Sequence, residues 1–256
     1  MERFMKSVSK LVLGGILSLT SMLSVAETVN YYVIAKQAQP FQIEEGSENH
    51  SGIVTDIVKA IFSKGGYELN YHTYPFNRMI TILEAGGEKN WITYGSPNWG
   101  KVQAENLSDI PIYTVKHALV TSKTGDFEFQ GMNSMKGKGV VLLHGFDYPQ
   151  LAPYIQSGDV EEIRVKNYRS AFKVVSRTPG ETAFVEMSSR VKYNLGKLNL
   201  DQGRYDIQPF SDVIPDYNIY LAFDKNMDPR IQAFINERLV ELTQSGEIEA
   251  IVSKYI

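Results

Sequence analysis

Small polar groups and a cation follow a predicted short strand at residues 91–94. The strand leads into Gly95-Ser96-Pro97-Asn98, a turn that leaves backbone N–H groups and a hydroxyl at a strand end, and Lys101 comes next on one helical turn. Loops at strand ends commonly carry ligand-binding groups, because the strand holds them in place while they stay accessible. These residue types suit a small polar ligand. The alternative is an ordinary loop and a surface helix that carries a solvated Lys101.

A second group of candidate residues lies further along the chain. A buried-strand pattern at residues 139–143 leads into His144-Gly145-Phe146-Asp147, a predicted strand-to-helix turn. There Asp147 is expected to cap the helix, where it would repel an anion. A short predicted strand at residues 183–186 ends in Glu186. Glu186 or His144 could act as a general acid or base in an enzyme, and Glu186 could equally be a structural salt-bridge partner.

Motifs for metal binding and for covalent catalysis are missing from the sequence. There is no cysteine, no G-x-S-x-G and no P-loop, and the histidines do not follow an H-E-x-x-H spacing. Residues 44–50 hold three glutamates and His50, but they lack the alternating spacing of a calcium loop, so we expect a solvated loop. We expect no metal ion, no cofactor and no enzymatic activity.

The elements that must position these residues follow one order twice. In the first half, predicted strands at 29–35, 67–71 and 91–94 alternate with predicted helices at 53–62 and 75–85. In the second half, strands at 139–143, 160–165 and 183–186 alternate with helices at 148–155, 169–176 and 188–195. Short links in this order indicate mainly parallel sheets with right-handed crossovers and flanking helices, which is an α/β fold.

Two β-rich runs, at residues 117–121 and 216–223, suit extended crossings between two lobes. We therefore predict a first lobe of residues 27–120 and 222–256 and a second lobe of residues 121–221. Lobes joined in this way can close on a ligand by hinge bending.

The first residues resemble an export signal. Arg3, Lys6 and Lys10 precede an apolar run at residues 11–25, which small residues close at Ala26. This pattern predicts a signal peptide at residues 1–26, cleaved after Ala26. The full chain has a formal net charge of −3, and loss of this basic segment makes it more negative. Nucleic acid and anionic membranes are therefore unexpected partners.

Three stretches resemble the type II periplasmic solute-binding proteins, in the amino-acid-binding branch known as family 3. The clearest is IYLAFDKNMDPRIQAFINERLVELTQSGEIEAIVSKYI, which is similar to the return crossing and the closing helices of that family. The stretch GETAFVEMSSRVKYNL looks like the family's "DAVVGD…Y" pattern, and KVQAENLSDIPIY looks like "R-x-x-x-x-x-F-S-x-P-Y". The resemblance covers nearly all of residues 29–256.

The resemblance implies site residues. Glu186 falls where the family keeps an acid that binds the α-amino group of the ligand, and Ser96 falls on a ligand-contacting hydroxyl. Phe41 lies near an aromatic that packs on the ligand, with a core residue as the alternative. Lys101 replaces an Arg that binds the α-carboxylate, and a lysine lacks the planar fork of an arginine.

Other residues around the implied site have two interpretations each. Arg78 could supply a replacement cation, or it is a surface arginine at a helix start. Trp99 could stack on a ligand, close over it or simply pack. Asp147 stands where other members of the family bind the ligand carboxylate at a helix N-terminus. The departures at Lys101 and at Asp147 both put ordinary amino-acid recognition in question.

The function implied by the resemblance is that of a monomeric periplasmic protein. It would close on a small polar solute, such as an amino acid or a related amine, and deliver it to the membrane permease of an ABC transporter. The alternatives are a sensor component that presents the solute to a receptor or kinase, and a dehydratase-like enzyme on the same fold.

Overall fold

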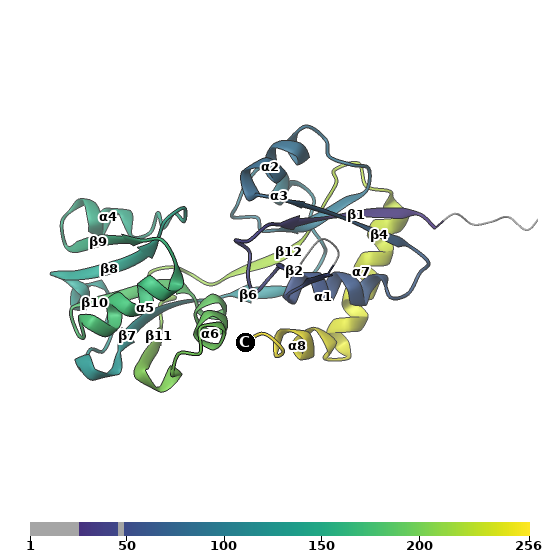
Figure 1. Ribbon diagram of the computed structural model, residues 1–256. Coiled ribbons are helices and arrows are strands. Elements are labelled where there is room, and N and C mark those ends of the chain that lie inside the picture. The colour runs from purple at the N-terminus through teal and green to yellow at the C-terminus, as the bar shows by residue number, and fades with distance from the viewer. Residues whose placement is uncertain (1–25, 46–48) are drawn as a thin grey trace, which may run out of the picture.

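A computed structural model describes residues 26–45 and 49–256 of this protein. The signal peptide predicted at residues 1–26 lies outside the described residues except for Ala26. Two five-stranded sheets, each flanked by helices, form two lobes connected by extended segments, as Figure 1 shows. The predicted α/β architecture is confirmed. Within the described part of the chain, no helix has the length and apolar character needed to span a membrane.

The first lobe is built on a sheet with the strand order β4-β1-β5-β12-β6. Strand β1 (Thr28–Ile34) pairs in parallel with β4 (Glu68–Tyr74) and β5 (Trp91–Gly95), whereas β12 (Tyr217–Phe223) runs antiparallel to β5 and to β6 (Tyr113–Val115). Helices α2 (Phe76–Glu84) and α3 (Val102–Glu105) lie on one side of this sheet. Helices α1 (Ile53–Phe62), α7 (Pro229–Gln244) and α8 (Glu247–Val252) pack together on the other (Figure 1).

The second lobe repeats this design in the order β11-β7-β10-β8-β9. Strands β8 (Lys138–Leu143), β9 (Val160–Val165) and β10 (Thr182–Met187) are parallel, whereas β7 (His117–Ser122) runs antiparallel to β10 and to β11 (Tyr205–Pro209). Its helices are α4 (Ala152–Gln156), α5 (Tyr168–Arg177) and α6 (Ser188–Lys197). In each sheet, the strand that arrives from the other lobe is the reversed one.

Alternation along the strands divides the core of the second lobe into two halves. Successive side chains of a strand point to opposite faces of the sheet. On β10, Ala183 and Val185 belong to the apolar cluster on the α4 side, and Phe184 belongs to the cluster formed with α5 and α6. Glu186 has the same parity as Phe184, so it faces α5 and α6 at the carboxyl end of its strand.

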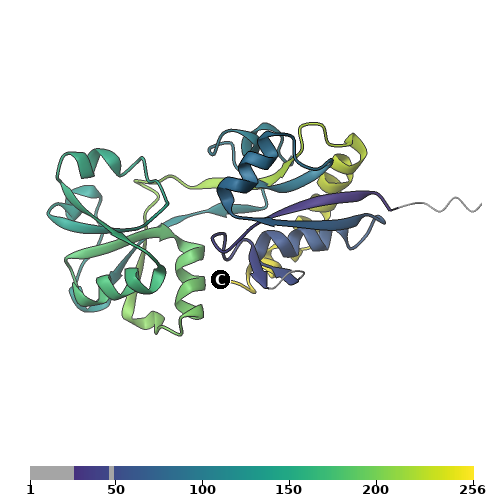
Figure 2. The same ribbon diagram turned by 45° about the horizontal axis from the view of Figure 1, so that its top comes forward.

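The crossings between the lobes are two extended segments that run side by side (Figure 2). The first passes from β6 through Lys116 directly into β7, and the second leads from β11 through residues 210–216 to β12. Because β7 lies in the second sheet and β12 in the first, we propose lobe boundaries at Lys116 and within residues 210–216. Both boundaries come a few residues earlier than 120 and 221, where the sequence places them.

Several local predictions need correction. The predicted solvated loop at residues 44–50 is wrong, because β2 (Ile43–Glu45) pairs antiparallel with β3 (Asn49–Ser51), and His50 is buried with Nε2 3.1 Å from Thr73 Oγ1. Asp147 does not cap a helix, because α4 begins at Ala152 rather than at residue 148. Strands β6 and β11, which are short and mixed in polarity, are not predicted from the sequence at all.

Gly95 allows the close packing that holds the loop after β5. A Cβ atom at this position would lie 2.0 Å from the carbonyl oxygen of Gln103 on α3, and the side chain of Gln103 in turn donates to Tyr94 O at 2.8 Å. Backbone cannot move aside as a flexible side chain can. The glycine therefore lets α3 sit against the strand end that carries Ser96.

We expect Gly95→Ala to lower the free energy of unfolding by roughly 1–3 kcal/mol, as overpacking does. The matched control is Gly196→Ala on α6, where a Cβ meets nothing within 4 Å and the residue is exposed. That change should raise the free energy of unfolding by up to about 1 kcal/mol, because alanine favours a helix. Urea unfolding of both variants measures the difference, and equal stabilities would contradict this packing.

Candidate ligand-binding site

Glu186 is a buried carboxylate at the end of β10, only 1% exposed. Its Oε1 accepts a hydrogen bond of 2.8 Å from the backbone N–H of Met187, and its Oε2 accepts one of 3.1 Å from the hydroxyl of Tyr168. Burial raises the pKa of the Glu186 carboxyl, and the charge of Arg190 is the largest influence that opposes the rise. A further positive charge close to this side chain would therefore stabilise its ionised form.

Arg190 lies one turn beyond Glu186, on the first turn of α6, and is 6% exposed. Its Cζ lies 4.8 Å from the centroid of the Phe146 ring. Nε and Nη1 have no hydrogen-bond partner among the described residues, and no carboxylate of that part of the chain lies within 4.0 Å of the guanidinium. Burial opposes the charge, but Glu186 acting together with Tyr168, Tyr94 and Tyr148 outweighs it, and the pKa of Arg190 lies above its usual value.

Aromatic side chains surround these two charges. Burial is the largest influence on four tyrosines and raises their pKa values, whereas the charge of Arg190 lowers them. These are Tyr94, Tyr148, Tyr168 and Tyr217. The ring of His117 lies 6.2 Å from that of Tyr148 and 6.1 Å from that of Tyr217. We call this set the junction cluster, because it combines residues of both lobes and of the crossings: Tyr94, His117, Phe146, Tyr148, Tyr168, Glu186, Arg190 and Tyr217.

The first lobe contributes Tyr94 and Ser96 from the end of β5. Tyr94 is 3% exposed, and burial raises its pKa to about 12 despite the opposing charge of Arg190. Ser96 is fully buried; its hydroxyl donates to Asn218 O on β12 at 2.8 Å and lies 3.4 Å from the backbone N of Asn98. Ser96 therefore ties the loop after β5 to the returning crossing.

Two predicted aromatic contacts lie next to Tyr94. Phe41 is 2% exposed, with its ring centroid 6.1 Å from Tyr94 and 5.5 Å from Tyr113, within the core of the first lobe. Trp99 is 36% exposed and meets Tyr94 edge-on at 5.5 Å and Tyr217 at 6.3 Å. In this structure Phe41 supports Tyr94 from the core side, and Trp99 presents an accessible ring beside the junction cluster.

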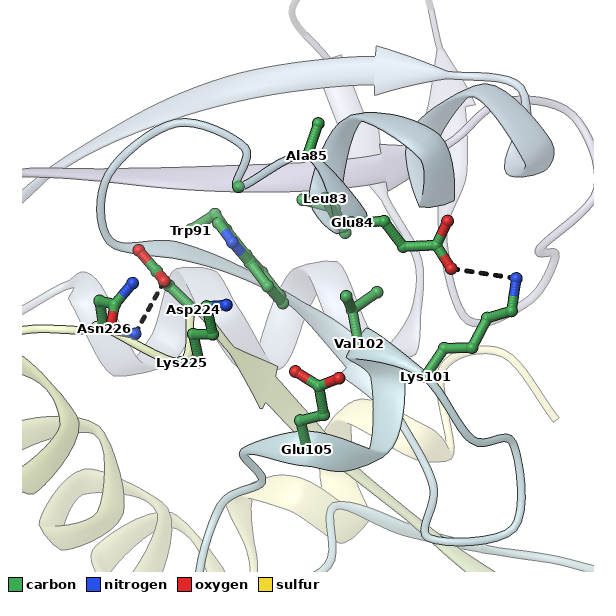
Figure 3. A pocket seen from close by; sticks show the side chains of 11 residues that line it. Leu83, Glu84, Ala85, Trp91, Lys101, Val102, Glu105, Asp224, Lys225 and Asn226 are labelled. Carbon is green, nitrogen blue, oxygen red and sulfur yellow. Dashed lines mark hydrogen bonds and ion pairs between the residues drawn. The ribbon is translucent and has the colours of Figure 1, made fainter.

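Lys101 does not join Glu186 in the structure. Its Nζ lies 3.0 Å from Glu84 Oε1 on α2, and its side chain is 70% exposed. This ion pair lies at the edge of a pocket of about 290 Å³ that is lined by residues of the first lobe alone, among them Trp91, Val102 and Glu105 (Figure 3). The carboxylate-binding role of Lys101 stays a prediction, and the geometry gives the lysine a different partner.

Arg78 and Asp147 are both exposed. Arg78 lies on α2 with its Cζ 5.0 Å from the centroid of the Tyr74 ring. The loop that holds Asp147 is fixed instead by Arg164, whose Nη1 donates to Leu143 O at 2.9 Å and to Phe146 O at 2.6 Å. The positions of Arg78 and Asp147 therefore give the least support to the ligand-binding roles predicted for them.

Arg190 is the residue that sequence reasoning missed. Arginine is rarely buried, so a helical arginine is ordinarily assigned to the surface. The available signal was its spacing, four residues after an acid that ends a predicted strand. Tyr148 and Tyr168 carried no comparable signal.

Residues 32–256 match the family model of the bacterial extracellular solute-binding proteins, family 3. The chain is 26% identical over 229 residues to the arginine-binding extracellular protein ArtP of Bacillus subtilis (strain 168), across 85% of this chain and 82% of that protein. The crystal structure of the substrate binding protein of an amino acid ABC transporter shares 21% identity with a TM-score of 0.60, across 90% of this chain and 99% of that one.

A third similar structure is the ancestral amino acid-binding protein AncCDT-1, described as a precursor of cyclohexadienyl dehydratase, with 17% identity and a TM-score of 0.62 across 89% and 94% of the two chains. Together the two lobes, the reversed crossing strands and these likenesses define a type II periplasmic binding fold, which confirms the predicted fold class. Because the family model spans most of its length, the chain belongs to the bacterial extracellular solute-binding proteins of family 3.

The buried imidazole of His117 makes stability depend on pH. Burial, and then the charge of Arg190, lower the pKa of His117 from 6.5 to about 4, although Asp216 opposes the shift. Between these values the unfolded chain binds a proton that the folded protein does not. The contribution of His117 to the free energy of unfolding is therefore fully present above pH 6.5 and is lost as the pH falls to about 4.

We expect this loss to amount to roughly 3 kcal/mol in the wild type. Urea unfolding at several pH values in this window should show a correspondingly smaller loss for His117→Gln, whose amide does not titrate. The same acid sensitivity in both proteins would show that other groups cause it.

Proposed function

We propose that this protein binds an amino acid in the periplasm and delivers it to the membrane permease of an ABC transporter. The observation that carries the proposal is the buried Glu186 carboxylate, placed at a strand end beside the crossings in a chain of a solute-binding family. ArtP is named for arginine binding and the similar solved structure for amino acid transport, which supports the choice of solute class. The basic and apolar pattern of residues 1–26 and the family's extracellular character support the periplasm.

Glu186 suits the amino group of such a solute. Each carboxylate oxygen accepts one hydrogen bond in the structure and has the lone-pair capacity to accept another. A charged amine placed there would form a charge-assisted hydrogen bond away from water, where such bonds are strongest. The same buried environment would disfavour neutral ligands, because they form no charge-assisted hydrogen bond that offsets the desolvation of the carboxylate.

Closure of the lobes would report the bound solute to the permease. A solute that contacts Glu186 on the second lobe and Tyr94 or Trp99 on the first favours the closed form by the difference in its affinity for the two forms. The crossings at Lys116 and at residues 210–216 supply the hinge. We propose that the protein works as a monomer and that the permease recognises the closed form.

Binding without turnover is part of the proposal. Glu186 is buried and accepts hydrogen bonds from Met187 and Tyr168, whereas His144 is exposed on its loop, which supports binding rather than acid–base catalysis. Incubation of the protein with a bound amino acid, followed by mass spectrometry, should recover the amino acid unchanged. Formation of a dehydrated or decarboxylated product would identify an enzyme instead.

The role of Glu186 can be tested on protein stripped by unfolding and refolding. An amino acid at about 100 times its dissociation constant should add roughly 2.7 kcal/mol of stability, visible as a shift of several degrees in a thermal melt. In Glu186→Gln the dissociation constant should rise roughly 30-fold or more, because one partner of a buried charged contact is lost. Glu181→Gln, which changes an exposed glutamate just before the same strand, is the control. Equal affinities in all three proteins would remove Glu186 from the site.

The proposal also predicts a pH dependence of binding. The pKa of Glu186 is raised in the free protein, and a bound amine would lower it, so binding must release a proton wherever the free carboxyl is protonated. Affinity should therefore fall as the pH is lowered through the raised pKa of Glu186. Isothermal titration calorimetry in two buffers of different ionisation enthalpy measures the released proton. Proton uptake at the acidic end would have the wrong sign for this contact.

A further inference from the structure

The guanidinium of Arg190, a member of the junction cluster, has two nitrogens that lack hydrogen-bond partners in the described part of the chain. Arg190 is 6% exposed, and its Nε and Nη1 lack hydrogen-bond partners in the part of the chain that the structure describes. A buried guanidinium normally has its donors paired, because a donor that has lost its water without gaining a partner destabilises the fold. An anionic group that enters the cluster would satisfy them.

The surroundings of Arg190 favour a ligand over a structural partner. Phe146 covers one face of the guanidinium at 4.8 Å, which leaves the edge donors available to a planar anion. Glu186, the acid that raises the pKa of Arg190 most, already accepts hydrogen bonds from Met187 and Tyr168, and no ion pair within 4.0 Å joins it to the guanidinium. The backbone N–H of Ser188, at the start of α6, donates to Lys116 O on the first crossing at 2.8 Å, so the helical turn that carries Arg190 lies beside the connection between the lobes.

Lys101 is differently placed. It forms an ion pair with Glu84 at 3.0 Å and stays 70% exposed beside a pocket of the first lobe (Figure 3). Recruitment of Lys101 to a ligand would require that pair to break. Arg190 needs no such change, because its Nε and Nη1 already lack partners among the described residues.

We propose that Arg190 binds the carboxylate of the solute, so that the second lobe alone holds both charged ends of a zwitterion, with the amine at Glu186. This inference rests on the proposed function and deepens it: the solute class is a free amino acid with both its amino and carboxylate groups, rather than an amine. Arg190 then takes the role that the sequence suggests for Lys101.

The test compares free amino acids with their carboxamides, in which the carboxylate is neutral and the amine is kept. Wild-type protein should bind the free acid of its best solute roughly 30-fold or more tightly than the amide, as expected for loss of one partner of a buried charged contact. In Arg190→Gln this preference should disappear, with the free acid weakened towards the affinity of the amide. Lys101→Gln, the matched change at the other cation, should keep the full preference.

Arg190→Lys and the Lys101→Gln comparison keep the outcome decisive if Arg190→Gln does not fold. Arg190→Lys keeps the charge but not the planar fork, and should retain only part of the preference. Loss of the preference in Lys101→Gln would overturn the inference by itself. So would equal binding of acid and amide by the wild type, and in either case amino-acid binding would stand. Failure of the wild type to bind any amino acid would overturn the proposed function and this inference together.

Discussion

The buried charges of Glu186 and Arg190 impose the constraint on which the rest of the site depends. Moving a carboxylate or a guanidinium out of water is costly unless partners compensate for it, and a loosely paired couple is compensated only in part. Met187 and Tyr168 each donate one hydrogen bond to the carboxylate, whereas two nitrogens of the guanidinium have no partner among the described residues. The imbalance makes the second lobe receptive to a ligand with an anionic group.

The fold places the guanidinium of Arg190 close to the crossings between the lobes, where a rotation of the lobes would change its surroundings. Helix α6 begins directly after β10, and the backbone N–H of Ser188 donates to Lys116 O on the first crossing at 2.8 Å. The first turn of α6, which carries Arg190, is thus attached to the hinge. Across the junction, Lys197 at the end of α6 donates to Gln39 Oε1 of the first lobe at 2.8 Å. Rotation about the crossings would therefore change the surroundings of the whole helix.

The sequence predicts the elements better than it predicts the contacts between them. Apolar periodicity is a local property, and it correctly places β1, α1, β8, α5 and β10 to within a few residues, whereas the three-residue strand β6 has too few residues for a pattern. The place of Glu186 near a strand end follows from the strand pattern, and its role in binding is implied by the family resemblance. The pairing of Lys101 with Glu84 could not be predicted, since it depends on how α2 and α3 pack, and the burial of Arg190 depends on the tertiary position of α6.

The position of the binding cation decides the order in which the lobes engage a solute. If Arg190 and Glu186 hold both charged ends, the second lobe can capture a zwitterion before closure, and the first lobe adds only apolar and aromatic contacts. Tyr94 and Trp99, whose ring centroids lie 5.5 Å apart, would then discriminate between the side chains of solutes rather than between their charges. Affinity for the common backbone of amino acids and selectivity among them would thus reside on different lobes, and a change in Trp99 could alter the preferred solute without loss of the charged anchor.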